Sequence, residues 1–285
     1  MAEFETYVAR ADARVAEALA QTASPFSIEV RFLGGLTKKQ REAFKTAADR
    51  WARVIVGDLP SMEVDGEVID DLLILAQGQN IDGPGRVLGQ AGPTRLRPRG
   101  TARTALLPVK GEMTFDSADL KKMETGGTLT DVITHEMGHV LGIGTIWPLK
   151  RLVRNAGTDD PGFIGKGALA EYVALRGNRP GRPSGVPVEN TGGRGTAGAH
   201  WRETVFRNEL MSGFIADPGN PLSRMTAASL GDLGYTVDVD AAEPYVIPDL
   251  MALAERGLLQ SHVAPIDDGV MLGFIPTVLP EDAVR

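Results

Sequence analysis

The stretch DVITHEMGHVLGIGTIW, residues 131–147, contains two of the 4 histidines of the chain. His135 and His139 are four positions apart, and Glu136 directly follows the first. On an α-helix, residues i and i+4 project from the same face, so these two imidazoles can hold one Zn²⁺ at about 2.0–2.1 Å each. Glu136 points about 100° away from His135, off the ion but near a water bound to it. This is the arrangement that H-E-x-x-H requires for metal-assisted hydrolysis.

The residues around this motif predict a helix that ends soon after His139. Thr128 and Asp131 follow two glycines in the order of a capping box, which indicates where the helix starts. Gly142 allows the helix to stop and the chain to turn sharply. A chance H-E-x-x-H is rare in a chain so poor in histidine, so a purely structural role for the pair is disfavoured. The buried stripe is expected to comprise Leu129, Val132, Ile133, Met137, Val140 and Leu141.

A third ligand must come from elsewhere, because a catalytic zinc site uses three protein ligands and leaves one position open to water. The short metzincin spacing places a third histidine three residues after the glycine, and Thr145 stands there instead. Only His200 and His262 remain. His200 is followed eleven residues later by Met211 in ELMSG, a plausible tight turn that would set an apolar floor under the imidazoles. We therefore expect His200 to be the third ligand and His262 to be an ordinary surface histidine.

Three segments together resemble one family. THEMGHVLGIGTIW, VPVENTGGRGTAGAHWRE and NELMSGF are similar to the leishmanolysin-like metallopeptidases, over about residues 105–237. The resemblance implies a zincin fold, endopeptidase activity and a single catalytic zinc. It assigns the ligand role to His135, His139 and His200, the catalytic base to Glu136, and the methionine turn to Met211. The best-known members are rich in cysteine, secreted and membrane-anchored, with a propeptide, so their setting and activation route are not expected to carry over.

The predicted fold is α+β, with a metzincin-like catalytic domain over residues 25–245. Its upper lobe, 25–142, should hold a twisted mixed sheet and two long helices, the second bearing the ligands. Its lower lobe, 143–245, should be irregular, with the methionine turn and a helix near its end. An N-terminal helical extension is expected over 1–24, and a C-terminal extension packed on the catalytic domain over 246–285. The segment 78–100 is so dense in glycine and proline that it predicts a long surface loop.

The substrate should be a protein or peptide that adds a strand to the edge of the sheet. The strand expected to offer that edge comprises Gly111, Glu112, Met113, Thr114 and Phe115. Glu136 would take a proton from the attacking water and return it to the leaving amine. Tyr235 is a candidate oxyanion donor, although a place in the core is the better interpretation. Three alternatives stay open: a zinc peptidase with Glu171 as third ligand, a non-catalytic protein pinned by zinc, and hydrolysis of a non-peptide amide.

Composition limits the other possibilities. The net charge of -7 argues against a nucleic-acid binder, and the absence of cysteine excludes disulfides and thiolate ligands. A calcium site at Asp70, Asp71 and Asp82 is conceivable, but turn chemistry explains these residues better. Neither a signal peptide nor an apolar membrane span is evident, which leaves a cytoplasmic location or a signal-less export route. A monomer is slightly favoured.

Overall fold

The computed structural model describes residues 4–81, 83, 89–193, 195–213, 215, 218–255, 270–271 and 274–285. Asp82 and His262 lie outside these residues. None of the described helices is long and apolar enough to span a membrane.

A seven-stranded mixed sheet forms one half of the molecule, in the order β1-β2-β5-β7-β6-β11, with β12 also paired to β6. β2, β5 and β7 run parallel, β1 is antiparallel to β2, and β6 is antiparallel to β7. β5 is the run LLILAQGQ, which is fully buried on one face and half-buried on the other. The α+β class is therefore confirmed. The bounds are β1 Glu5–Arg10, β2 Ser27–Gly34, β5 Leu72–Gln79, β6 Gly89–Leu96, β7 Pro108–Asp116, β11 Val270–Met271 and β12 Thr277–Val278.

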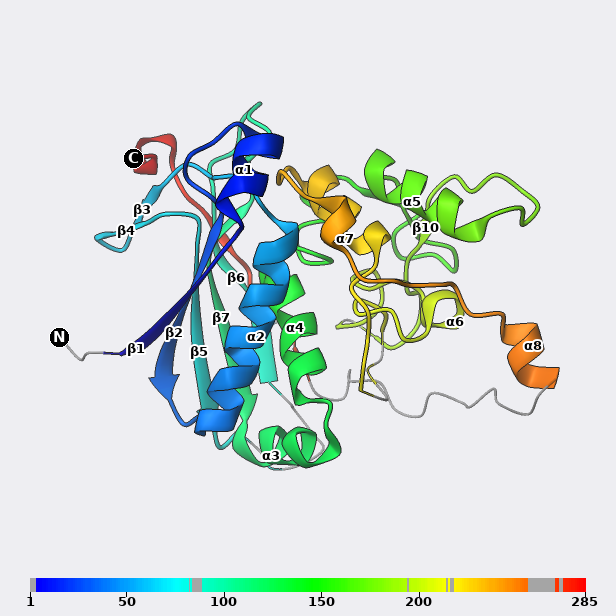
Figure 1. Ribbon diagram of the computed structural model, residues 1–285, viewed down its shortest axis with the longest axis horizontal. Coiled ribbons are helices and arrows are strands. Elements are labelled where there is room, and N and C mark those ends of the chain that lie inside the picture. Colours follow the sequence, from blue (N-terminus) through cyan, green and yellow to red (C-terminus); the bar gives the residue numbers. More distant parts are fainter. Residues whose placement is uncertain are drawn as a thin grey trace.

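Two helices, α2 (Lys38–Val54) and α4 (Leu129–Val140), lie side by side across one face of the sheet (Figure 1). α2 begins with a capping box, in which Thr37 accepts from the Gln40 amide and Gln40 from the Thr37 amide. The capping box expected for α4 does not form, because Thr128 makes no side-chain cap bond. Asp131 instead accepts hydrogen bonds from Arg50 and from the Gly219 amide, which tie α4 to its neighbours.

The other half of the molecule, beyond α4 in Figure 1, consists of short elements joined by long connections. Its core is an aromatic cluster in which Trp147, Trp201 and Phe163 pack ring to ring. Arg50 joins the two halves, because it also donates to Glu243 and to the Asn220 carbonyl. The elements here are β8 Val153–Arg154, β9 Gly162–Phe163, α5 Lys166–Arg176, β10 Val186–Pro187, α6 Glu203–Phe206, α7 Arg224–Leu233, η1 Val239–Ala241 and α8 Leu250–Glu255. The remaining elements are α1 Ala13–Ala20, β3 Met62–Val64, β4 Glu67–Ile69, α3 Ser117–Gly126 and η3 Glu281–Ala283.

Two expectations fail at the borders of the sheet. The N-terminal extension is not wholly helical, since Glu5–Arg10 form β1, where Ala9 is buried and Tyr7 reaches Asp49 of α2. The expected edge strand is wrong as well, because β7 lies between β5 and β6 and is hydrogen-bonded on both sides. The strand that covers β7 is β6, with the sequence GQAGPTRL. Its glycines and proline are typical of loops, which is why the segment 78–100 was wrongly predicted to be a surface loop.

Candidate metal centre

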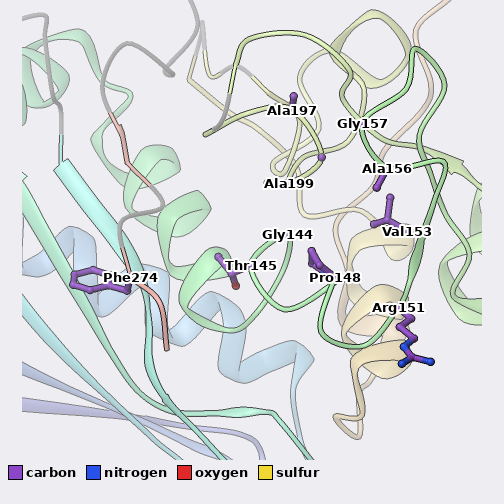
Figure 2. Close-up of a pocket in the computed structure, with 11 residues that line it drawn as sticks. Gly144, Thr145, Pro148, Arg151, Val153, Ala156, Gly157, Ala197, Ala199 and Phe274 are labelled. Atoms are coloured by element: carbon purple, nitrogen blue, oxygen red, sulfur yellow. The ribbon is translucent and has the colours of Figure 1, made fainter. Parts of the chain in front are cut away.

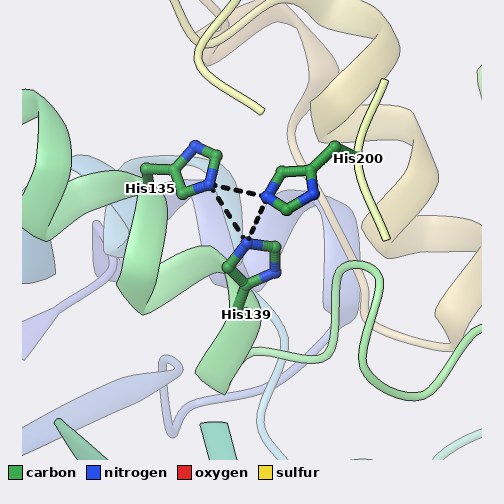
Figure 3. Close-up of side chains that lie close together, drawn as sticks. All are labelled: His135, His139 and His200. Atoms are coloured by element: carbon green, nitrogen blue, oxygen red, sulfur yellow. Dashed lines mark hydrogen bonds between the residues drawn. The ribbon is translucent and has the colours of Figure 1, made fainter. Parts of the chain in front are cut away.

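Three imidazoles meet at one point between the two halves of the molecule (Figure 3). His135 and His139 project from α4, and His200 comes from the connection between β10 and α6. Their Nε2 atoms are 3.1 Å apart for His135–His139, 3.0 Å for His135–His200 and 2.9 Å for His139–His200. All three side chains are almost fully buried. The structure therefore brings His200 to the helical pair across some 60 residues of chain.

Each imidazole is oriented by a main-chain carbonyl on its other side. The Nδ1 atom of His135 lies 2.7 Å from the Leu210 oxygen, that of His139 2.8 Å from the Ile143 oxygen, and that of His200 3.0 Å from the Thr196 oxygen. A carbonyl oxygen can only accept, so each Nδ1 carries the proton and donates it. The neutral rings therefore present three unprotonated Nε2 lone pairs to one another.

This donor set fits a divalent cation. Lone pairs facing one another have no proton to share, so only a positive charge between them makes the arrangement favourable. Two nitrogens bound tetrahedrally to one metal ion at about 2.05 Å are roughly 3.3 Å apart, a few tenths of an ångström more than the separations found here. Imidazole nitrogen is a ligand that zinc and the later first-row metals accept. Of the described residues, this group and Asp58, Asp70 and Asp71 are the ones close enough to share an ion.

Burial sets the protonation of the site. Desolvation, with a smaller effect from His200, lowers the pKa of His135 to about 3, and the same causes hold the pKa of His139 well below its usual range. Both rings are thus neutral at pH 7, as metal ligands must be. Burial raises the pKa of Glu136 to about 8, and its Oε2 has no hydrogen-bond partner in the described part of the chain. A buried carboxylate oxygen without a partner is costly unless a ligand or water completes it.

The turn that follows α4 lies against the segment that carries His200. Gly142 has φ of +110° and Gly144 has φ of +74°, conformations that favour glycine. A Cβ at Gly144 would lie 2.2 Å from the Ala199 oxygen, so this glycine lets the turn approach the segment that carries His200. Thr145, which occupies the position of the short-form third histidine, is not a ligand. Its Oγ1 donates to the His139 carbonyl at 2.8 Å and satisfies the end of the helix.

Met211 packs against α4 between the two ligands on that helix. A Cβ at Gly138 would lie 2.7 Å from Sδ of Met211 and 2.9 Å from Cζ2 of Trp51, so only glycine leaves room for the thioether. The main chain of Met211 is fixed, because its carbonyl accepts from the Trp201 amide at 2.9 Å. The carbonyl of Leu210, the residue before Met211, orients His135. The turn at 209–212 therefore makes two contacts with the site, through this carbonyl and through the Met211 side chain.

Sequence reasoning missed two residues that hold this turn. Glu209 is fully buried, and its carboxylate accepts from the Met211 amide at 2.6 Å and from the Ser223 hydroxyl at 2.6 Å. The signal available was weak, since a glutamate two residues before the methionine has no fixed meaning in a sequence. Gly138 was also missed, although a glycine inside a helix pattern indicates close packing.

The other candidates are placed elsewhere. Glu171 is not brought to the histidine pair; it is paired with Arg224, with Nε–Oε2 at 2.9 Å, so the assignment of Glu171 as third ligand is wrong. Tyr235 is fully buried and donates to the Leu141 carbonyl at 2.9 Å, as the core interpretation requires. Asp71 accepts from the Ser27 and Leu59 amides, 44 and 12 residues away, so it joins distant segments rather than forming the local turn that was expected.

A cavity of about 550 Å³ opens beside the two segments that carry His139 and His200. In Figure 2 Phe274 lies on one side of Thr145, and Pro148 and Ala199 lie on the other. Most lining side chains are small and apolar. The cavity therefore suits an uncharged side chain of a bound ligand.

The comparison with protein families agrees with this site. The leishmanolysin family model, peptidase M8, matches residues 181–251. Over these residues the chain is similar to the leishmanolysin family. The matched segment contains His200 and Met211 but not the H-E-x-x-H motif. The leishmanolysin resemblance read from the sequence is therefore confirmed for the part of the chain that carries the third histidine. No curated protein matches the chain.

Proposed function

We propose that this chain is a zinc-dependent endopeptidase with a metzincin-type zincin fold, acting on protein or peptide substrates. His135, His139 and His200 would hold the ion, and Met211 would form the methionine turn beneath them. The observation that carries the proposal is the convergence of three unprotonated Nε2 atoms, with the buried and unpartnered carboxylate of Glu136 next to His135 in the sequence. Bound zinc supplies a Lewis acid that polarises a carbonyl and lowers the pKa of water toward 7.

Glu136 is the group that moves the proton. Burial alone raises its pKa to about 8, whereas a divalent cation close by favours the ionised form. These opposed effects leave a base able to accept a proton near neutral pH. Glu136 takes the proton from the attacking water and returns it to the amine that leaves. The unpartnered Oε2 is the atom we assign to this transfer.

The substrate is proposed to lie extended along β6 rather than β7, because β6 packs against α4 and its outer side is paired only with the short strands β11 and β12 among the described residues. Main-chain hydrogen bonds would hold the peptide, and the cavity lined by Thr145 and Ala199 would take one of its side chains. We place the substrate between an upper lobe, 25–142, and a lower lobe, 143–245.

Glu136→Gln tests the proposal, because glutamine keeps the shape of the side chain but cannot accept the proton. The variant should retain zinc and lose peptide cleavage by about 10²- to 10⁴-fold. Glu17→Gln, at an exposed position on α1, is the matched control and should cleave as wild type does. Cleavage of a peptide library is measured together with metal content. Full activity of Glu136→Gln would refute the mechanism, and a zinc-loaded wild type that cleaves nothing would indicate a structural ion instead.

A further inference from the structure

The border of the sheet where a substrate would bind is already covered by the chain itself. β12 pairs parallel with β6, with Thr277 opposite Arg95 and Val278 opposite Leu96. The Leu279 amide donates to the Leu96 carbonyl at 2.9 Å, and β11 pairs with the start of the same strand at Gly89. The outer hydrogen-bonding groups of β6 are thus used at both of its ends.

Phe274 comes between these two pairings in the sequence. A Cβ at Gly92 would lie 3.6 Å from Cδ2 of Phe274, which puts the ring against the middle of β6. The same phenylalanine lines the cavity that Thr145 and Ala199 border (Figure 2).

We propose that the segment Phe274–Val278 inhibits the enzyme in cis, by lying where a substrate strand would pair with β6 and by putting Phe274 at the side-chain cavity. The inference rests on the proposed peptidase function. It adds a regulatory contact made by residues near the C-terminus of the same chain. A substrate can pair with β6 only after this segment has left the edge of the strand. The segment runs parallel to β6, so it presents its main-chain groups in the opposite direction to a peptide that would add an antiparallel strand there, and occupying the edge need not make it a substrate.

The anchoring of the segment makes release local. Downstream, the Arg285 amide donates to the Ser61 carbonyl at 2.8 Å and Ala283 is buried, so the end of the chain is fixed to the sheet. Ile275, next to Phe274, is 97% exposed and contributes little to holding the segment down. Phe274 is therefore the apolar contact whose loss should release the segment without disturbing the anchor.

The test compares Phe274→Ala with the matched control Ile275→Ala. If the segment is seated about nine-tenths of the time, full release raises kcat/KM about tenfold, and the control should stay within roughly twofold of wild type. Zinc content and thermal midpoint, measured on all three proteins, should be equal. A synthetic peptide with the sequence of residues 274–280, FIPTVLP, should inhibit Phe274→Ala in trans, and the same peptide with alanine for phenylalanine should inhibit less.

The outcomes separate the two ideas. Equal kcat/KM for wild type and Phe274→Ala, with no inhibition by the peptide, would overturn cis inhibition and leave the peptidase standing. Equal activation by Ile275→Ala would also overturn it, because a solvent-facing side chain has no contact to lose. Zinc-loaded wild type and Phe274→Ala that both fail to cleave any library peptide would overturn the proposed function, and cis inhibition with it.

Discussion

Gly138→Ala is the change that tests most directly how Met211 packs against α4, the helix that bears His135 and His139. Inside a helix, alanine is ordinarily more stable than glycine by about 0.8–1.0 kcal/mol. At this position the added methyl group would lie 2.7 Å from Sδ of Met211 and 2.9 Å from the Trp51 ring. Both separations are well below van der Waals contact, so one of the two neighbours must move.

Neither neighbour moves freely. Trp51 is fully buried, and its Nε1 donates to the Thr134 carbonyl at 2.9 Å. The thioether of Met211 is flexible, but its main chain is tied by hydrogen bonds at both the amide and the carbonyl. Overpacking a close-packed core costs about 1–3 kcal/mol, which exceeds the propensity gain. We expect Gly138→Ala to lower the free energy of unfolding by about 0.5–2 kcal/mol and to weaken zinc binding.

Gly126→Ala is the matched control, because this glycine is the last residue of α3 and a Cβ there meets nothing within 4 Å. It should leave stability unchanged or raise it by up to about 1 kcal/mol. Urea unfolding of the zinc-loaded proteins, followed by competitive zinc titration, measures both effects. If Gly138→Ala proves as stable as Gly126→Ala and binds zinc as wild type does, Met211 does not pack against α4 in this way.

Three further predictions follow from the same contacts. Chelation of the ion should lower the thermal midpoint by about 5–10 °C in calorimetry, since a metal at 100 times its Kd contributes about 2.7 kcal/mol; an unchanged midpoint would contradict metal binding by the three imidazoles. His200→Ala should lose zinc in metal analysis and Glu171→Ala should keep it; the reverse pattern would contradict the site. Arg50→Met should cost about 2–4 kcal/mol at pH 7, because it leaves Asp131 and Glu243 without their cation. Burial alone would raise the pKa of Glu243, but hydrogen bonds from Arg50 and the Leu222 amide hold it below its ordinary value. That stabilisation is present above about pH 4.3 and lost as pH falls, so the difference in midpoint between Arg50→Met and wild type should shrink toward pH 3; a constant difference would argue against the ion pair.

The ligand helix could be predicted from the sequence because its signals are local. Two histidines at i and i+4 fix their own relative geometry once a helix forms. The link to His200 was harder, since it spans a long insertion, and it depended on the small number of histidines to choose from. The wrong helix cap at Thr128 shows the limit of such signals. Asp131 has stronger partners in Arg50 and the Gly219 amide, which only the tertiary structure brings near.

The sheet border was predicted wrongly for a physical reason. A strand is recognised from its own residues, but whether it lies inside a sheet or at its edge depends on which other segments pair with it. β6 carries two glycines and a proline, so its pattern resembles that of a loop, and β1 is too short to show its alternation clearly. The covering of β6 by residues close to the C-terminus is a non-local pairing with no sequence signal at all.

The backbone carbonyls behind the three imidazoles have a consequence for how this protein can change. Side chains that steer a ligand are exposed to mutation, whereas a main-chain oxygen persists under any substitution that preserves the local path of the chain. The orientation of the three imidazoles is thus independent of the small side chains around the neighbouring cavity, such as those of Ala197 and Val153, which can be exchanged without changing it. If the chain is the endopeptidase proposed above, a new cleavage preference can be selected in the laboratory without altering the three ligands.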